Sequence, residues 1–493
     1  MNRLHLLLLA LLTASGISAQ RHITLDLQST IEIASDSSLQ AFRSQNLYMS
    51  GYWEYVSFKA GRLPSLSLNL TPASYNQSVT REFDNTDQVY RYYSLKSYSA
   101  SGGLNIVQNF DPLGGTFYVE SSLAYMRNFG HTRYTQYSAI PVRIGYRQDL
   151  LGFNQFRWER RIEPVKYEKV KKEFLYNMEE VSETAVNYFF NLALAQAEYR
   201  LAKDNLASAD TIYTVGERRF KIASISQADL LTLRLDKVNA ENTLANTRIA
   251  LKRAMFSLAS FLGMDKNTEI TVQLPSVPSA RTIDPDLALM HAKANNPKLL
   301  SHRQGILEAQ RDVSRTRMEQ RFNANINASV GFNQFADNFS GAYHHPMRQD
   351  IVSLSINIPL IDWGVRKGRL NMAKNNLNIL EIQARQDELS MEEDVIMTVS
   401  DFNIQRQLVS SAIEALDLAE TSYAQTRQRF IIGKADLNTL TLSQNRQQDA
   451  NKNYITSLQN YWLSYYKLRK LTLFDFDSGM ELSNKLDIQH HIR

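Results

Sequence analysis

The sequence predicts a mainly α-helical protein that also carries β-strands of a membrane type, built as two tandem repeats of one unit. Three observations predict this fold class: long stretches without glycine or proline, an apolar heptad pattern that recurs at a fixed offset, and short segments in which apolar and polar residues alternate. The length of 493 residues alone would fit two or three domains. The repeat reduces this to one duplicated unit.

The N-terminal segment has the pattern of a secretory signal peptide. Residues 1–19 hold a basic Arg3, an apolar stretch at Leu6–Leu12 and small residues up to Ala19. The apolar stretch is too short to span about 30 Å of hydrocarbon. The small residues that follow it predict cleavage after Ala19. The chain has no cysteine, which excludes acylation as a lipoprotein, disulfides, thiolate nucleophiles and iron–sulfur clusters.

Four stretches between Pro164 and Gly479, each of roughly 45 to 65 residues, contain no helix breaker, whereas an ordinary helix has about 11 residues. Within them apolar residues recur at alternating spacings of four and three, and adding 210 to each number gives a second series in the same register. This heptad pattern predicts coiled-coil helices. The two series begin with Val181, Ala185, Tyr188, Leu192 and Ala195, and with Met391, Val395, Thr398, Phe402 and Gln405.

The offset of 210 extends beyond the heptads, and it pairs Arg219-Phe220 with Arg429-Phe430. Further upstream the offset becomes 260, so the first copy carries about 50 extra residues, roughly within 71–147. Each copy reads helix, strand, loop, strand, long helix, turn, long helix. The predicted parts are a signal peptide at 1–19, a first repeat at 20–265, an inter-repeat linker or equatorial region at 266–292, a second repeat at 293–474, and a surface or disordered tail at 475–493.

The strand segments alternate with period two. Leucines at 66–70 alternate with small polar residues, residues 352–358 do the same, and the insert adds Gly102–Phe110 and Thr116–Met126. Such strands fit a half-buried sheet in water or a barrel wall with lipid outside. Residues 71–156 also hold 16 of the 50 aromatic residues, which fits interfacial girdles or aromatic surface loops.

The number of strands implies association if they span a membrane. Two strands per copy give four per chain, or up to six with the insert, and a closed barrel needs about eight. A sheet in lipid cannot leave its edges unpaired. Several chains would therefore share one barrel.

Two turns, at 219–230 and 429–437, join the long helices. Gly433 fits a left-handed helix C-cap, and Ser226 and Asp436 fit the N-caps of the following helices. In a purely structural interpretation, these two turns are only the ends of helical hairpins. Apolar residues at the ends of long helices would nevertheless be exposed unless a partner covers them; these residues are Ile222, Ile225, Ile431 and Ile432.

No pattern for catalysis or cofactor binding is present. The sequence has no GxSxG, Walker or HExxH motif. The pairs His344-His345 and His490-His491 lack carboxylates at metal-binding spacing, and the acidic pairs Glu179-Glu180 and Glu392-Glu393 indicate a solvated helix face. The 55 basic and 50 acidic residues are mixed along the chain, which does not suggest a nucleic-acid binder. We expect no enzymatic activity, cofactor, metal or nucleic acid.

Together, the signal peptide, the duplicated helix–strand–strand–helix order, the heptads and the paired turns resemble the TolC-type outer-membrane efflux protein family. The turns share the pattern aromatic-x-x-Gly/Ala-x-x-Ser/Asp, from Phe220 to Ser226 and from Phe430 to Asp436. The resemblance covers essentially the whole mature chain. It implies a homotrimer with a shared 12-stranded β-barrel in the outer membrane and an α-helical barrel across the periplasm. It also implies a periplasmic adaptor and an inner-membrane pump of the RND or ABC type as partners.

By position, the resemblance makes the two turns the tips that meet the adaptor. The residues so assigned are Arg219, Phe220, Ile222, Ala223, Ile225, Ser226, Arg429, Phe430, Ile432, Gly433 and Asp436. In the family's best-known member, aspartates on the helix after the second turn constrict the channel, and this chain has Thr439 and Leu442 there. Either Asp436, one turn earlier, forms the ring of the gate, or the gate closes by packing. Three Asp436 carboxylates near an axis would repel each other unless protonated, paired or bound to a cation, and as an ordinary N-cap Asp436 needs no gating role.

Two functions remain open at this point. The first is a passive exit duct in the outer membrane, reaching into the periplasm, for a tripartite efflux or type I secretion system. The second is a periplasmic or surface coiled-coil scaffold that transports nothing and whose strands form a soluble sheet.

Overall fold

A computed structural model describes residues 22–84, 86–130, 133–276 and 282–485. The predicted signal peptide, residues 1–19, lies outside the described residues, and so do His490 and His491. The described part of the chain divides into two compact units: unit 1 comprises the described residues within 1–49, 171–297 and 388–493, and unit 2 those within 50–170 and 298–387.

Long helices dominate the fold, as predicted. Helices α4 and α8 have 67 residues each, and both bounds of α8 follow those of α4 at the predicted offset of 210. Helix α4 begins upstream of Pro164, at the cost of one backbone hydrogen bond in its early turns. The helices are α2 (Leu27–Ser37), α3 (Leu39–Ala60), α4 (Gln155–Lys221), α5 (Gln227–Phe261), α6 (Pro285–Asn295), α7 (Pro297–Glu319), α8 (Val365–Ile431), α9 (Leu437–Thr472) and α10 (Leu482–Lys485).

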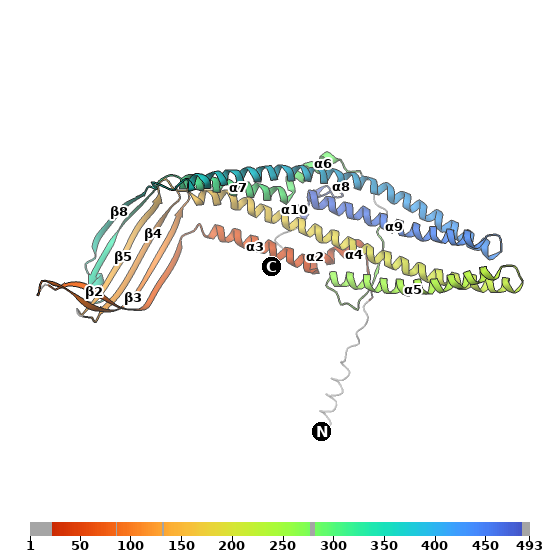
Figure 1. Cartoon of the computed structure of the whole chain (residues 1–493), viewed down its shortest axis with the longest axis horizontal. Coiled ribbons are helices and arrows are strands. Elements are labelled where there is room, and N and C mark those ends of the chain that lie inside the picture. Colours follow the sequence, from red (N-terminus) through yellow and green to blue (C-terminus); the bar gives the residue numbers. More distant parts are fainter. Residues whose placement is uncertain (1–21, 85, 131–132, 277–281, 486–493) are drawn as a thin grey trace, which may run out of the picture. The chain divides into compact units, whose positions relative to one another are not determined.

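Unit 2 contains a six-stranded antiparallel sheet in the order β2-β3-β4-β5-β7-β8, whose strands lie side by side in Figure 1. Its strands are β2 (Ser65–Asp84), β3 (Val89–Phe110), β4 (Gly115–Asn128), β5 (Tyr134–Asp149), β7 (Asn323–Ala336) and β8 (Met347–Asn357). The predicted insert at 71–147 therefore supplies β3 and β4 and parts of β2 and β5. Residues 89–96 of β3 pair only with β2, and here the two strands form a projecting ribbon.

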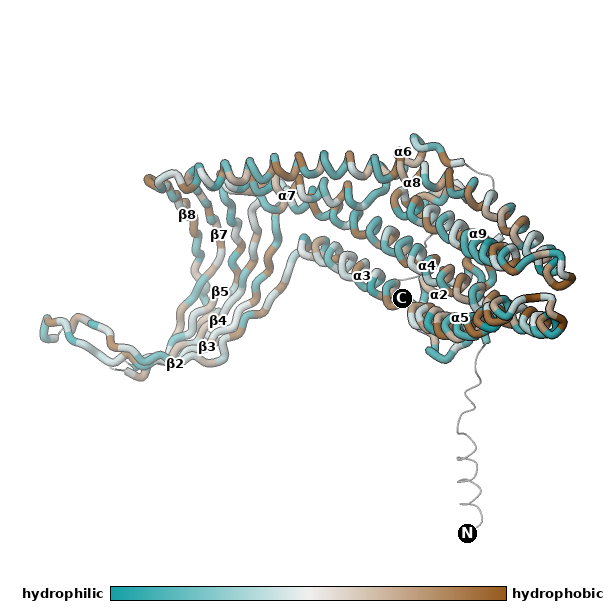
Figure 2. Tube along the Cα trace, turned by 45° about the vertical axis from the view of Figure 1, so that its right-hand side comes forward, coloured by the Kyte–Doolittle hydropathy of each residue, from teal (hydrophilic) through white to brown (hydrophobic). Residues whose placement is uncertain are grey.

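The strand register confirms the predicted alternation and extends it across the sheet. One row of paired positions joins Leu66, Ile106, Val119, Ile144 and Val330, one from each of five neighbouring strands. The adjacent row on the opposite face is made of Ser67, Asn105, Glu120, Arg143, Gly331 and Gln349. One face is thus apolar and the other polar, and Figure 2 shows the same alternation of hydropathy along the strands.

The strand number differs from the one that the resemblance implies. A 12-stranded barrel of three copies needs four strands from each chain, whereas the sheet has six. The physical reason is that the insert forms its own antiparallel hairpin, β3–β4, which is hydrogen-bonded on one side to β2 and on the other to β5, both within the first predicted repeat.

Unit 1 buries the predicted heptad positions. Val181, Ala185 and Leu192 on α4 and Met391 and Val395 on α8 are nearly inaccessible to solvent. The region predicted as a linker, 266–292, contains β6 (Glu269–Val272), which pairs in parallel with β1 (His22–Leu25), and the first part of α6.

The prediction of a surface or disordered tail is wrong for residues 475–485. Strands β9 (Phe474–Asp475) and β10 (Met480–Glu481) pair, and Phe476 and Leu482 are buried. Asp475 is buried too, and it accepts a hydrogen bond from the Tyr465 hydroxyl of α9 at 2.7 Å. Apolar burial and this hydrogen bond hold the segment against α9 in the absence of any heptad.

The interpretation of Glu179 as part of a solvated face is also wrong. Only 6% of this residue is exposed, and its carboxylate accepts a charge-assisted hydrogen bond from Arg469 of α9 at 2.8 Å. A charged residue is tolerated inside a helix interface when its partner is present.

No helix among the described residues is both long and apolar enough to cross a membrane.

Candidate functional site

The two helix-to-helix turns form the candidate site, and we call them the tips: residues 219–230 between α4 and α5, and residues 429–437 between α8 and α9. Figure 1 shows both turns at the same end of unit 1, in green and blue.

Both tips end their first helix with the same hydrogen-bond pattern, a Schellman motif. The backbone N–H donors and carbonyl acceptors, 2.8–3.0 Å apart, are Ser224 to Arg219 and Ala223 to Phe220 in the first tip, and Lys434 to Arg429 and Gly433 to Phe430 in the second. The motif places Ala223 at φ 54° and Gly433 at φ 81°. The predicted left-handed cap at Gly433 is confirmed, and Ala223 adopts the same backbone region without the freedom of glycine.

The predicted N-caps are also confirmed. The Ser226 hydroxyl accepts from the backbone N–H of Asp229 at 3.1 Å, and the Asp229 carboxylate accepts in return from the N–H of Ser226 at 3.0 Å. The Asp436 carboxylate accepts from the N–H of Thr439 at 2.7 Å. The hydrogen bonds from Ser226 lower the pKa of Asp229, and those from Thr439 lower the pKa of Asp436, so both carboxylates are ionised at neutral pH.

Arg219 links one tip to the other. Its Nη2 atom donates to the carbonyl oxygens of Phe430 at 3.0 Å and Ile431 at 2.9 Å. These carbonyls close α8, where the helix dipole is negative and favours a cation. The guanidinium carbon also lies 5.6 Å from the centre of the Phe430 ring. A Cβ atom on Gly433 would come within 3.1 Å of Nη2, so this glycine leaves room for the bridge.

A small apolar cluster lies beneath the bridge and draws on all four long helices of unit 1. Its buried members are Ile212, Leu233, Phe430 and Leu440, and the half-buried side chains packed around them are Tyr213, Ile225, Tyr423, Ala435 and Leu437. The cluster fastens the two hairpins to each other at their ends. Two of the predicted docking residues, Phe430 and Ile225, therefore serve packing within the chain.

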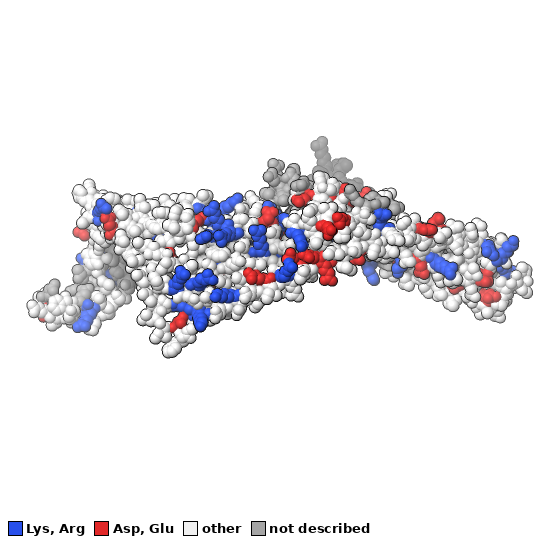
Figure 3. Space-filling view, turned by 90° about the horizontal axis from the view of Figure 1, so that it is seen from above, with Lys and Arg blue, Asp and Glu red and all other residues white. Residues whose placement is uncertain are grey.

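The outer surface of the tips is apolar with basic flanks. Phe220, Ile222 and Ile432 are 40%, 75% and 65% exposed. Basic side chains on the last turns of α4 and α8 and in the turns outnumber the acidic ones, and Figure 3 shows charges of both signs at this end. The basic residues are Arg218, Arg219, Lys221, Arg429 and Lys434, and the acidic ones are Glu217, Asp229 and Asp436.

The two tips are alike in sequence and different in environment. Phe220 and Phe430 occupy corresponding positions, 210 residues apart, and only Phe430 is buried. Arg219 forms the bridge, whereas its counterpart Arg429 is exposed. Among the large side chains of the predicted docking residues, Phe220 and Ile222 are therefore exposed on one tip, and Arg429 and Ile432 on the other.

The candidate gate residues lie on the first turns of α9. Asp436, Thr439 and Leu442 are all exposed, and at spacings of three they share one helix face. The neighbouring Leu440 and Ser443 are buried. The structure places Asp436 as an N-cap and brings no cation to it from within the described residues of its own tip.

Sequence reasoning missed a polar bridge between α4 and α8 behind the tips. The Ser208 hydroxyl lies 3.2 Å from the Tyr423 hydroxyl and accepts from the Nε of Arg427 at 3.1 Å. The sequence feature that could have indicated this bridge was the pair of tyrosines at equivalent heptad positions, Tyr213 and Tyr423, which are 210 residues apart.

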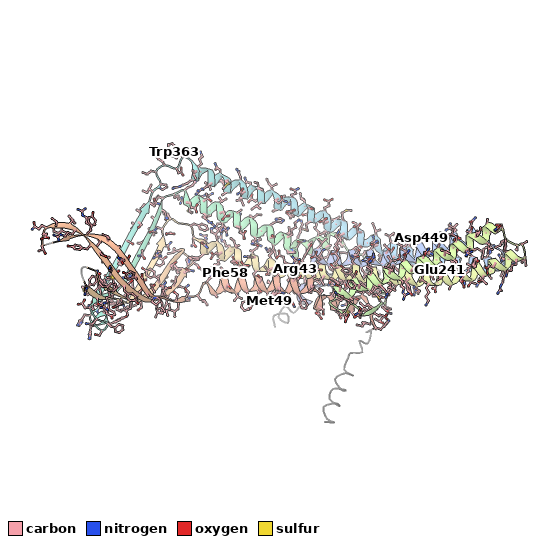
Figure 4. The ribbon with its side chains drawn as sticks, turned by 60° about the horizontal axis from the view of Figure 1, so that its bottom comes forward. Arg43, Met49, Phe58, Glu241, Trp363 and Asp449 are labelled. Atoms are coloured by element: carbon pink, nitrogen blue, oxygen red, sulfur yellow. The ribbon has the colours of Figure 1, made fainter. Side chains whose placement is uncertain are left out.

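The second helices of the hairpins carry acidic groups away from the tips. Glu241 on α5 and Asp449 on α9 are both exposed (Figure 4). Among the described residues no group of three or more histidine or acidic side chains could hold a metal ion. His344 and His345 lie exposed after a short 3-10 turn, with ring centres 5.8 Å apart.

Comparison with known proteins identifies the architecture. Residues 288–472 match the model of the family described as outer membrane efflux protein, and no curated protein sequence matches the chain. The outer-membrane channel OprN has 14% identity and a TM-score of 0.65, with 90% of this chain and 89% of that chain covered. The CmeC outer membrane channel of Campylobacter jejuni has 13% identity and a TM-score of 0.66, with 94% and 88% covered.

A third similar structure is the outer membrane protein VceC of Vibrio cholerae, with 13% identity, a TM-score of 0.63, and 91% and 95% of the two chains covered. At such identities the likeness shows the fold. The resemblance predicted from the sequence is confirmed: the chain has the fold of these outer-membrane channels, and part of its second half matches the outer membrane efflux protein family.

Proposed function

We propose that this chain, which has the fold of outer-membrane channels, is the passive exit duct of a tripartite efflux or type I secretion system. In this proposal three copies share one barrel in the outer membrane, and their long helices line the conduit in the periplasm. The tips meet a periplasmic adaptor, and an RND or ABC pump in the inner membrane drives transport. The leader is removed at export, and no lipid anchor is attached.

The observation that carries the proposal is the two-faced sheet of unit 2. Its apolar face is exposed on a large scale: Leu66 is 68% exposed, Ile144 57% and Val352 75%. Monomeric soluble proteins rarely expose so extensive an apolar surface. If lipid covered the apolar face and water covered the polar face, each face of the sheet would contact a solvent of matching polarity.

Aromatic and large apolar side chains border this face at both ends, as an interfacial belt requires. At the helix-proximal end Leu360 is 88% exposed and Trp363 is 94% exposed, and Trp363 projects from the connection between β8 and α8 (Figure 4). At the other end Tyr125 contacts Tyr98 and Tyr137 at ring-centre distances of 6.2 and 5.0 Å.

The length of β4 up to Tyr125 fits a bilayer. Strand β4 begins at Gly115 and reaches Tyr125 about ten residues later, or ~33 Å along the strand. With a tilt of about 35–45° this corresponds to an apolar band of ~25 Å. The sheet therefore has the height of a membrane wall.

The tips support the adaptor as partner. Phe220, Ile222 and Ile432 form a solvent-exposed apolar surface with basic residues beside it, and such a surface is suited to cover by another protein. For the gate we propose closure by packing around Thr439 and Leu442, because the carboxylate of Asp436 is engaged as an N-cap.

The test is the behaviour of the purified mature chain in lipid. We expect it to require detergent, to migrate differently on a gel before and after heating, and to give discrete conductance steps in planar bilayers. A water-soluble mature chain that leaves bilayers unperturbed would overturn the proposal and favour the coiled-coil scaffold.

A further inference from the structure

The sheet of unit 2 has two open edges. Within the described residues no strand pairs with the outer side of β2 or of β8. In lipid, unpaired backbone N–H and C=O groups cost several kcal/mol each, so both edges need a partner. Because the six strands alternate in direction, β2 runs antiparallel to β8, and the β8 edge of one copy can continue the antiparallel order onto the β2 edge of the next.

All six strands belong to the same wall. The apolar row crosses the insert strands without interruption, through Ile106 of β3 and Val119 of β4. Ile106 is 39% exposed and Phe117 of β4 is 45% exposed, so the insert presents apolar side chains on the same face as β2 and β8. If the insert hairpin lay outside the membrane-facing sheet, its apolar residues would not need to align with the apolar rows of the neighbouring strands.

The polar face is continuous across the same strands. Arg143 of β5 donates to Glu120 of the insert strand β4 at 2.7 Å and to Gln349 of β8 at 2.6 Å. On the same face, the Tyr118 side chain of β4 passes over Gly145 of β5, and its hydroxyl donates to Asn327 of β7 at 3.1 Å. The insert is thus tied to the other strands by side chains on the face that would line a water-filled lumen.

We propose that each copy contributes six strands to the barrel, so that three copies close an 18-stranded barrel in which β8 of each copy pairs with β2 of the next. This rests on the proposed trimeric channel. Because barrel diameter grows roughly linearly with strand number, the outlet would be about one and a half times as wide as one of 12 strands. Barrels of 16 to 18 strands keep an aqueous channel.

Lipid exposure of the insert strands tests the proposal, and the absence of native cysteine makes single labels specific. Ile106→Cys, Val119→Cys and the β8 control Leu354→Cys would each carry a polarity-sensitive fluorophore in vesicles of phospholipids brominated on their tails. Asn105→Cys, next to Ile106 and on the polar face, is the matched control. We expect several-fold quenching of the labels at 106, 119 and 354 and little quenching at 105.

Labels at 106 and 119 that stay unquenched while the label at 354 is quenched would overturn the 18-stranded barrel and leave the membrane channel intact. A label at 354 that also stays unquenched would instead overturn the proposed function. These variants are on the sheet surface, and the chain's correct assembly is checked by its heat-modifiable migration.

Crosslinking tests the closure between copies. Ser67→Cys on β2 combined with Ser353→Cys or Ser355→Cys on β8 places both thiols on the polar face. We expect oxidation to give covalent trimers with one of the two pairs, whereas each single variant stays monomeric in denaturant. Monomers only, or a barrel of 12 strands counted by electron cryomicroscopy, would overturn the proposal.

Discussion

The Nη2 atom of Arg219, at the end of α4, donates hydrogen bonds to the carbonyl oxygens of Phe430 and Ile431 at the end of α8. The two hairpins of unit 1 are therefore joined at their tips by one side chain, which also lies over the ring of Phe430. The arrangement of the two tips relative to each other depends on this bridge.

Loss of the bridge should loosen the second tip. Arg219→Ala removes two hydrogen bonds from a cation at the negative end of α8, and we expect local opening to become easier by about 1–2 kcal/mol. Hydrogen exchange of residues 425–445, followed by mass spectrometry, measures this. Arg218→Ala, an exposed neighbour, should leave the exchange unchanged, and equal effects of the two variants would contradict the bridge.

Replacing the two tip phenylalanines by alanine should affect different properties, the stability of the tips in one case and adaptor binding in the other. Phe430→Ala empties the buried cluster and should destabilise the tips by about 3–5 kcal/mol. Phe220→Ala, at the corresponding exposed position, should leave exchange near normal and weaken adaptor crosslinking. A strong effect of Phe220→Ala on exchange, with none from Phe430→Ala, would reverse our assignment.

Gly433 should tolerate asparagine better than valine. Its φ of 81° disfavours a β-branched residue, so Gly433→Val should strain the turn by about 1–3 kcal/mol and impair adaptor docking. Gly433→Asn accepts the left-handed region and brings the same Cβ atom toward Arg219, so it is the control that separates backbone strain from crowding of the bridge. Unchanged export and unchanged adaptor crosslinking in the valine variant would count against a docking role.

Ala223 should be improved by glycine. It adopts the left-handed region at φ 54°, which costs a non-glycine residue roughly 1–2 kcal/mol. Glycine would relieve this strain, although the larger conformational entropy of glycine in the unfolded chain offsets part of the gain. Ala223→Gly is therefore expected to slow exchange at residues 215–232 by several-fold. Faster exchange would show that the turn stores no such strain.

The cap at Asp436 should depend on acid pH. Hydrogen bonds from Thr439 hold the pKa of Asp436 below its usual value of 3.8. The ionised cap therefore stabilises the start of α9 above about pH 4, and this contribution disappears as the pH falls through the lowered pKa. Asp436→Asn keeps an acceptor and does not titrate, so exchange in the two proteins should converge as the pH falls through the lowered pKa of Asp436. A difference that is constant with pH would contradict the cap.

Much of the fold was predictable because its signals are local and repeated. The heptads and the 210-residue offset predicted α4 and α8, whose bounds keep that offset, and the turn residues predicted the caps at Ser226, Gly433 and Asp436. The period-two segments predicted a two-faced sheet. Each of these follows from neighbours along the chain.

The remainder depended on contacts that the sequence does not encode locally. Phe220 and Phe430 stand in identical motifs, and only packing between the hairpins decides which is buried. Glu179 has the pattern of a surface charge, and its partner Arg469 lies 290 residues away. The strand number depended on whether the insert hairpin joined the sheet, which is a matter of pairing between distant segments.

Electron cryomicroscopy of the mature chain in lipid nanodiscs would show whether the sheets of several copies form one wall in the membrane. We expect three copies whose sheets lie within the disc, with the row from Leu66 to Val330 facing lipid and Arg143 facing the lumen. A sheet that lies in solvent outside the disc, or copies that share no wall, would contradict this expectation.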